Sequence, residues 1–244
     1  MEDSKHVAAP RTDRIVLRKL CACLLLVGGL LATSTIDAIL AEILTGRATV
    51  VDGDTLDVGG QRVRLEGIDA PETAQHCRDS SGKRWDCGEA ARARLEELTA
   101  GRDVVCAGSR RDDFGRLIAT CRVGSEDLNA QLVREGFAWA FIKYSTSYVR
   151  EEEAARARRR GIFAAANRPA WEFRAERWAE ATKQGSAAPS GCPIKGNISW
   201  TDERIYHLPW QRDYGRTKID PNKGERWFCD EREAVAAGWR RAQR

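Results

Sequence analysis

Short β-branched segments joined by a glycine turn constrain the fold of this chain more than any other feature. The stretches "RATVVD", "TLDV" and "RVRLEGI" are typical of strands, and Gly-Gly-Gln (59–61) supplies a hairpin turn between the second and the third. Acidic residues stand where these strands end, in "VVDGDTLDV" and in "VRLEGIDAPET" (63–73). Because burying a charge is costly, carboxylates at apolar strand ends need a chemical explanation.

Helical segments and further strands alternate along the following part of the chain. "CGEAARARLEELTAG" (87–101) places Ala91, Leu95 and Leu98 at helical spacing and ends in glycine. The other predicted elements are, in order, strands at 103–108 and 116–123, a helix at 126–136, a strand at 137–142 and a helix at 147–161. This order predicts an α+β protein, a small closed β-barrel of the OB kind with helices packed on it.

The 244 residues fit one medium domain with a small appendage. A further helix is predicted at 168–184, followed by a linker-like stretch at 185–191. Composition then changes, since six of the eight tryptophans lie at or beyond Trp171. We predict four segments: an export segment at 1–41, the main domain at 42–167, a helix and linker at 168–190, and a small C-terminal module at 191–244 with a closing helix capped by Asp230 and Glu233.

The N-terminal segment has the layout of a secretory signal peptide. Arg11, Arg14, Arg18 and Lys19 precede the apolar run "LCACLLLVGGLLATS", which ends in small residues. The run is short for a membrane span, which needs about 20 apolar residues, although an uncleaved anchor with transient membrane contact is the alternative. We therefore expect export to the periplasm or the cell exterior.

Six cysteines follow the export segment: Cys77, Cys87, Cys106, Cys121, Cys192 and Cys229. An even number downstream of a signal sequence predicts disulfides, with sequence neighbours paired. A zinc site is the alternative, but no C-x-x-C pair occurs. His207 with Cys192 and Cys229 could form a second metal site. We favour a disulfide between the two cysteines beside a packed histidine, because the small core of the C-terminal module needs a covalent cross-link.

Residues suited to phosphodiester chemistry lie within one stretch of the barrel. Carboxylates can hold a metal that binds phosphate and orients water, and a free carboxylate can take the proton of that water. Arginine forks match phosphate oxygens. Asp54 and Asp69 are candidate metal ligands and Glu72 the candidate base; Arg64 and Arg116 are the candidate phosphate ligands.

Each of these signals also has a purely structural interpretation. "DGD" is most often a turn, Arg64 would serve equally as a structural ion-pair partner of Asp69 or Glu66, and "DFGR" is a loop with a glycine turn. The net charge of +4 permits a polyanionic partner without requiring one. Their joint occurrence in order is what favours a site.

The ordered blocks "VVDGDTLDV", "VRLEGIDAPE", "GEAARARLEEL", "DDFGR", "LNAQLVREGFAWA" and "EEEAARARRRGIF" resemble the staphylococcal-nuclease (thermonuclease) family. The resemblance covers about residues 45 to 165. It implies a five-stranded OB-fold barrel that carries out Ca²⁺-dependent hydrolysis of DNA and RNA and leaves 3′-phosphates. The C-terminal module resembles small tail modules of exported bacterial proteins, for which no activity is implied.

The resemblance also assigns residue roles. It implies that Asp54, Asp69 and the Ala70 carbonyl bind Ca²⁺, that Glu72 is the general base, and that Arg64 and Arg116 bind phosphate. Tyr144 matches a nucleotide-pocket tyrosine. Two positions depart from the family: Phe114 stands where a tyrosine is common, and Ile142 replaces another pocket aromatic, which removes a stacking face worth about 1–3 kcal/mol per base.

The insertion 74–88 is bracketed by Cys77 and Cys87. It is either a stapled solvent loop, which we favour, or a substrate-contacting rim using Arg78, Lys83, Arg84 and Trp85. For the whole chain, the sequence predicts an exported nuclease acting on DNA and RNA. The alternatives are a non-catalytic OB module that binds nucleic acid or protein, and a cell-envelope adaptor that works through its tail. No protein partner can be inferred.

Overall fold

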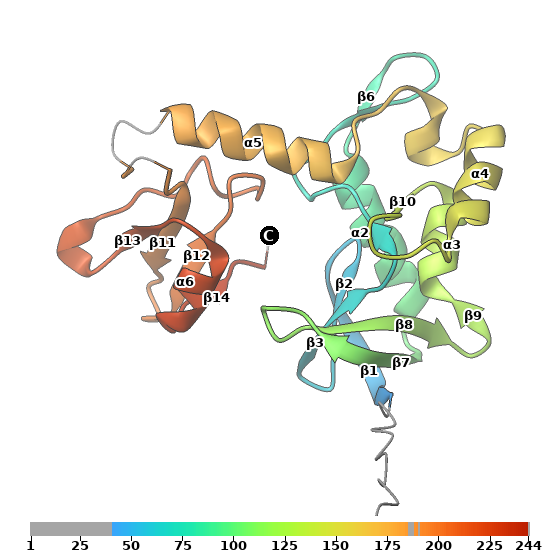
Figure 1. Ribbon diagram of the computed structural model, residues 1–244, viewed down its shortest axis with the longest axis horizontal. Helices are drawn as coiled ribbons and strands as arrows, with labels where there is room; N and C mark the ends of the chain where they lie inside the picture. Colours follow the sequence, from blue (N-terminus) through green and yellow to red (C-terminus); the bar gives the residue numbers. More distant parts are fainter. Residues whose placement is uncertain (1–40, 185–187, 190, 244) are drawn as a thin grey trace, which may run out of the picture. The chain divides into compact units, whose positions relative to one another are not determined.

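The computed structural model describes residues 41–184, 188–189 and 191–243 (Figure 1). The predicted export segment lies outside the described residues apart from its last position. Within the described part of the chain, no helix combines the length and the apolar character needed to cross a membrane.

Five strands close into a barrel, which confirms the predicted OB architecture. In Figure 1 they lie side by side in the order β3-β2-β1-β7-β8, and a parallel pairing of β3 with β8 completes the ring. The strands are β1 (Glu42–Asp52), β2 (Thr55–Val58), β3 (Gln61–Leu65), β7 (Asp103–Arg111) and β8 (Leu117–Val123). Alternate residues point inward, as the period of two along a strand requires, so that Leu56, Val63 and Leu65 are fully buried.

Three helices accompany the barrel: α2 (Cys87–Thr99) precedes β7, and α3 (Leu128–Glu135) and α4 (Val149–Ala157) follow β8. Ala91, Leu95 and Leu98 of α2 enter the barrel core as predicted. Helix α3 begins later than predicted, because Glu126–Asp127 forms the short strand β9 on β8. The side chain of Asp127 then caps α3 by accepting a hydrogen bond of 3.0 Å from the Ala130 amide.

The prediction of one strand over 62–68 was wrong. Strand β3 ends at Leu65, and the chain turns at Gly67, whose φ of +72° suits glycine. The next two residues form β4 (Ile68–Asp69), which pairs with β10 (Trp139–Ala140) outside the barrel. The predicted strand at 137–142 is reduced to β10, and the predicted helix at 147–161 ends at Ala157 before the 3₁₀ turn η1 (Gly161–Ala164).

The C-terminal region begins with α5 (Ala170–Gln184) and continues into a separate four-stranded sheet, ordered β13-β11-β12-β14. Its elements are β11 (Ile194–Ile198), β12 (Arg204–His207), η2 (Pro221–Lys223), β13 (Arg226–Phe228), α6 (Glu231–Ala236) and β14 (Arg240–Arg241). Tyr206, Phe228 and Trp239 form its core. Asp230 caps α6 as predicted, by accepting from the Glu233 amide at 2.8 Å; the Glu233 carboxylate accepts from the Cys229 amide, one residue before the position that the predicted capping box requires.

Three disulfides join the six cysteines as sequence neighbours: Cys77–Cys87, Cys106–Cys121 and Cys192–Cys229. The prediction of disulfides in place of zinc is confirmed. Cys106 and Cys121 lie opposite each other on β7 and β8. Cys77 opens the hairpin of β5 (Cys77–Arg78) and β6 (Arg84–Trp85), and Cys87 opens α2. Such bonds indicate an oxidising compartment, outside the cell or in the periplasm.

Candidate active site

Asp54 and Asp69, the two carboxylates predicted to bind metal, lie together and share one arginine. Arg64 on β3 donates through Nη1 to Asp54 Oδ1 and through Nη2 to Asp69 Oδ1, the second over 2.7 Å. Asp69 is fully buried and Asp54 is 3% exposed. The interpretation of Arg64 as an ion-pair partner of Asp69 therefore holds in this structure, and Asp54 is a second partner.

Hairpin register and one backbone contact produce this arrangement. Arg64 stands opposite Thr55 across β2 and β3, one residue from Asp54. The Asp54 carboxylate also accepts from the Ala70 amide at 2.7 Å, and so connects the turn after β1 to the end of β4. The barrel hairpin thus sets the arginine between the two aspartates.

Glu72 lies on a turn that is held from behind. The Gln75 amide donates to the Glu72 carbonyl over 2.7 Å, and the Glu72 amide donates to the Gln75 side chain over 3.2 Å. Gln75 in turn donates to the Arg168 carbonyl over 2.8 Å. At Gly88 in α2, a Cβ would stand 1.8 Å from the Glu72 carbonyl oxygen, so only glycine permits this close approach.

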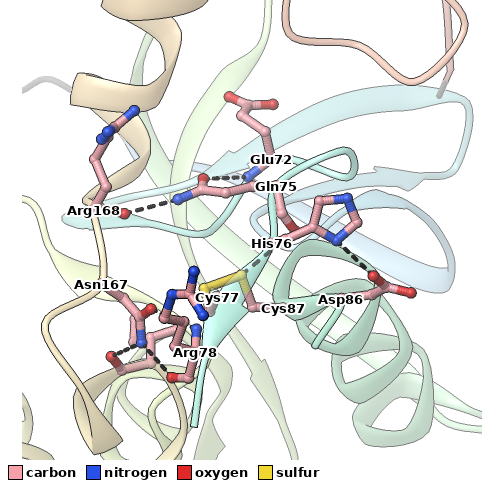
Figure 2. The surroundings of a disulfide bond; sticks show 10 residues. Glu72, Gln75, His76, Cys77, Arg78, Asp86, Cys87, Asn167 and Arg168 are labelled. Atoms are coloured by element: carbon pink, nitrogen blue, oxygen red, sulfur yellow. Dashed lines mark hydrogen bonds and ion pairs between the residues drawn. A yellow bond between two sulfur atoms is a disulfide. The ribbon is translucent and has the colours of Figure 1, made fainter. Parts of the chain in front are cut away.

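Figure 2 shows that the Cys77–Cys87 disulfide lies beside this turn and that the Glu72 carboxylate points away from the sulfur atoms. Of the predicted rim residues, Trp85 packs against the apolar cluster around the disulfide, and Arg78 donates to the Gly82 carbonyl over 2.9 Å. Lys83 and Arg84 are exposed, and none of the four is among the residues that line the site cavity described below. The contacts favour the stapled-loop interpretation.

A second arginine of the cluster, Arg174, connects Asp69 to Glu72. Arg174, in the first half of α5, donates to Glu72 Oε1 over 2.8 Å and to Asp69 Oδ1 and Oδ2 over 3.1 and 2.9 Å. Its side chain is 22% exposed and that of Glu72 12%. The predicted base Glu72 and the predicted metal ligand Asp69 therefore share the guanidinium of Arg174, a residue that was not predicted from the sequence.

Burial and neighbouring acids set the ionisation of the cluster. Burial, with the negative charges of Asp52 and Asp69, raises the pKa of Asp54 to about 8 despite the nearby Arg64. Burial also raises the pKa of Glu72, against the charges of Arg174 and Arg241. For Asp52, burial alone would raise the pKa, but Arg241 and Arg64 lower it. The charged forms of Asp54 and Glu72 are thus disfavoured in this cluster despite the neighbouring arginines.

Arg116, Phe114 and Tyr144 line one cavity of ≈ 470 Å³ together with Asp52, Asp54 and Glu72, whereas the fully buried Asp69 is not among its lining residues. Asp112 holds Arg116 by an ion pair of 2.6 Å, and the Arg116 guanidinium lies 5.6 Å from the centre of the Phe114 ring. Tyr144 is 58% exposed and stands edge-on to Phe141 at 5.0 Å. Ile142 is 69% exposed and does not line the cavity, whereas its neighbour Phe141 does.

Several cavity residues were not predicted from the sequence, among them Asp52, Phe141, Arg174, Trp210 and Arg241. Asp52 was visible as the first acid of D-G-D, and its carboxylate accepts from the Asp54 amide at 3.1 Å. The other four carry no motif, and two of them come from the C-terminal sheet region. Only the folded chain brings them to the site.

The donor set suits a hard divalent cation. Two carboxylates with a common partner are oxygen ligands of the kind that Ca²⁺ takes, and the Ala70 carbonyl is the further ligand that the family resemblance implies. The raised pKa of Asp54 means that its charged form is disfavoured in the cation-free site, and a bound cation would favour that form. In the described residues no three His, Cys, Asp or Glu side chains are arranged to hold a metal. In this structure Arg64 and Arg174 take the hydrogen-bonding places on these oxygens.

The barrel and its acid–arginine cluster define an OB-fold protein with a site suited to phosphate chemistry. Comparison with known proteins agrees: residues 62–165 match the model of the staphylococcal nuclease homologues, and residues 173–241 match a second family, ArfC. The chain belongs to the family of staphylococcal nuclease homologues.

Three relatives illustrate the range of the family. An uncharacterized endonuclease of Haemophilus influenzae is 30% identical over 58% of this chain and 78% of its own length. Micrococcal nuclease of Shigella flexneri is 32% identical over 51% of this chain and 76% of its own. The succinoglycan biosynthesis protein ExoI of Rhizobium meliloti is 40% identical over 46% of this chain, which spans 61% of ExoI. Two of these relatives are named as nucleases, which supports a nuclease function for this chain.

Proposed function

We propose that this protein is an exported, Ca²⁺-dependent nuclease that hydrolyses phosphodiester bonds of DNA and RNA and leaves 3′-phosphates. The observation that carries the proposal is that Arg64 donates to both Asp54 and Asp69. Glu72 is connected to Asp69 through Arg174, and Arg116 lines the same cavity as Glu72. Charged groups of both signs around one hollow are what in-line attack on a phosphate needs.

Each side chain has a role in this proposal. Asp54, Asp69 and the Ala70 carbonyl would hold the cation, which when bound supplies a Lewis acid for a phosphate oxygen. Glu72 accepts the proton of the attacking water, a role for which its raised pKa suits it. Arg64 and Arg116 donate to the phosphate oxygens as negative charge develops. Tyr144 offers a stacking face for a base.

Three disulfides support the proposed export, because such bonds persist in oxidising compartments. DNA and RNA are the proposed partners, and the arginines lining the cavity suit polyanions.

The test is cleavage by the purified full-length protein of single-stranded DNA and of RNA, with Ca²⁺ and with a chelator in excess. Cation-dependent cleavage with 3′-phosphate ends is the expected result. If no cation supports cleavage of either substrate, the proposal is wrong, and the non-catalytic OB module becomes the better description. The name of ExoI makes succinoglycan a useful control ligand, which we expect neither to be cleaved nor to compete.

A further inference from the structure

Arg174 takes hydrogen-bonding positions that a divalent cation would need. Two of its nitrogens contact both oxygens of Asp69, and one of these also contacts Glu72. Asp69 is fully buried, so the guanidinium is a major part of its charge compensation. A divalent cation bound to the same oxygens would lie close to the guanidinium of Arg174, and the two positive charges would repel each other.

Packing fixes Arg174 at this place. One turn earlier on α5, Trp171 stacks on Phe141 with ring centres 5.4 Å apart and an interplanar angle of 10°, and it meets Trp139 edge-on at 6.2 Å. Ala170 is fully buried in the same cluster. The start of α5 is therefore seated in the nuclease region, and Arg174 follows from it at helical spacing.

Charge balance identifies the consequence of this contact. Asp69 Oδ1 already accepts from Arg64, a residue also predicted to bind phosphate. Arg174 adds a second guanidinium to the same carboxylate and a first to Glu72. A guanidinium has no acceptor and stays charged, so it can leave these oxygens but cannot become neutral in place.

We propose, on the basis of the function proposed above, that Arg174 is an internal counter-ion that competes with the divalent cation for Asp69 and Glu72 and so sets the cation affinity of the site. Cation binding then requires Arg174 to leave the two carboxylates. The residue lies outside the matched nuclease segment, in a helix that continues into the tail.

Calorimetric titration of the cation-free full-length protein with Ca²⁺ tests this proposal. Arg174→Gln removes the charge and keeps hydrogen-bond donors, and it should tighten Ca²⁺ binding by about tenfold, because one like charge is gone. Arg174→Lys keeps the charge and should remain within about threefold of wild type. The matched control is Arg177→Gln on the same helix, where Arg177 pairs with Glu180, and it should change nothing.

Thermal unfolding supplies a readout that is independent of activity. Without Ca²⁺, Arg174→Gln should melt below wild type, since Asp69 loses a buried partner; with saturating Ca²⁺ the difference should close. If wild type binds Ca²⁺ and Arg174→Gln binds it no more tightly than wild type, the proposed competition by Arg174 is wrong while the cation site itself stands. If wild type also binds no Ca²⁺, the cation site of the proposed function is overturned with it.

Discussion

The carboxylate of Asp54 accepts a hydrogen bond of 2.7 Å from the backbone amide of Ala70. This contact joins a turn of the barrel to the segment that carries Asp69 and Glu72, 16 residues further along the chain. It uses only the backbone at position 70, which explains why an alanine serves there. The two halves of the site are thus connected before any ligand is considered.

Replacing Asp54 by asparagine should raise the cation-free melting temperature at pH 7 while weakening Ca²⁺ binding. Because burial raises the folded pKa of Asp54 to about 8, its neutral carboxyl group favours the fold; that contribution is complete below the unfolded pKa and is lost as pH rises toward 8. Asparagine keeps an acceptor for the Ala70 amide. Differential scanning calorimetry in chelator tests this, with Asp57→Asn, a half-exposed ion-pair partner of Arg62, as control. A lower melting temperature for Asp54→Asn would contradict the prediction.

Glu72→Gln should lower kcat by about 10²–10⁴-fold, the usual contribution of a general base. The amide oxygen still accepts from Arg174, so the surroundings are preserved. Binding of a non-cleavable oligonucleotide, measured by fluorescence anisotropy, should stay near the wild-type value. Retained turnover would show that another group takes the proton.

Arg64→Met should destabilise the cation-free protein by about 3–5 kcal/mol, because it leaves two buried carboxylates without their common partner. Arg62→Met on the same strand removes a more exposed pair with Asp57 and should cost about 0–1 kcal/mol. Chemical denaturation in chelator compares the two. Equal losses would indicate that Arg64 is no more important for folding than its neighbour.

Removing the Cys77–Cys87 disulfide with paired serines should reduce kcat as well as stability. The disulfide lies beside the turn that holds Glu72, and a displaced base costs activity, here about tenfold or more. Removing Cys106–Cys121, in the barrel wall, should cost about 2–5 kcal/mol of stability and leave kcat unchanged at a temperature where the variant is folded. Steady-state kinetics beside denaturation curves separates the two effects.

The tail should lose stability as pH falls below about 6.5, the unfolded pKa of histidine. Burial, with the charges of Lys195 and Arg240, lowers the pKa of His207 despite Asp213, and its Nδ1 is buried without a hydrogen-bond partner in the described structure. Because the folded pKa is depressed, the stability is complete above pH 6.5 and is lost as pH falls through the folded value. Calorimetry between pH 7.5 and 5 should show this slope in wild type and His76→Asn, but not in His207→Asn.

The sequence was sufficient where the determining contacts are local. The ion pair of Arg64 with Asp69 was one of the interpretations of the sequence, since the two residues are only five positions apart; the second partner, Asp54, was not predicted, although the hairpin register places it near Arg64. The Cys106–Cys121 pair follows from two adjacent antiparallel strands. In such cases spacing along the chain determines spacing in the fold.

Arg174 could not be predicted, because 102 residues separate it from Glu72 and "EFRAERW" resembles any amphipathic helix. Its position depends on Trp171 packing against Phe141, a tertiary contact. The break after Leu65 was missed for a similar reason, since β4 pairs with β10 about 70 residues later, as Ile68 does with Ala140.

Helix α5 belongs to both halves of the described chain. Its start packs beside Trp139, while Trp178 near its middle packs against the core of the tail sheet, 6.2 Å from Trp210. A truncation boundary placed between the two matched family segments would therefore strip the catalytic half of Trp171 and Arg174, and its cation response would be that of a different molecule. A cut after Gln184 keeps both residues but removes Trp210 and Arg241 from the cavity lining, so only the full-length chain reports the cation response of the intact site.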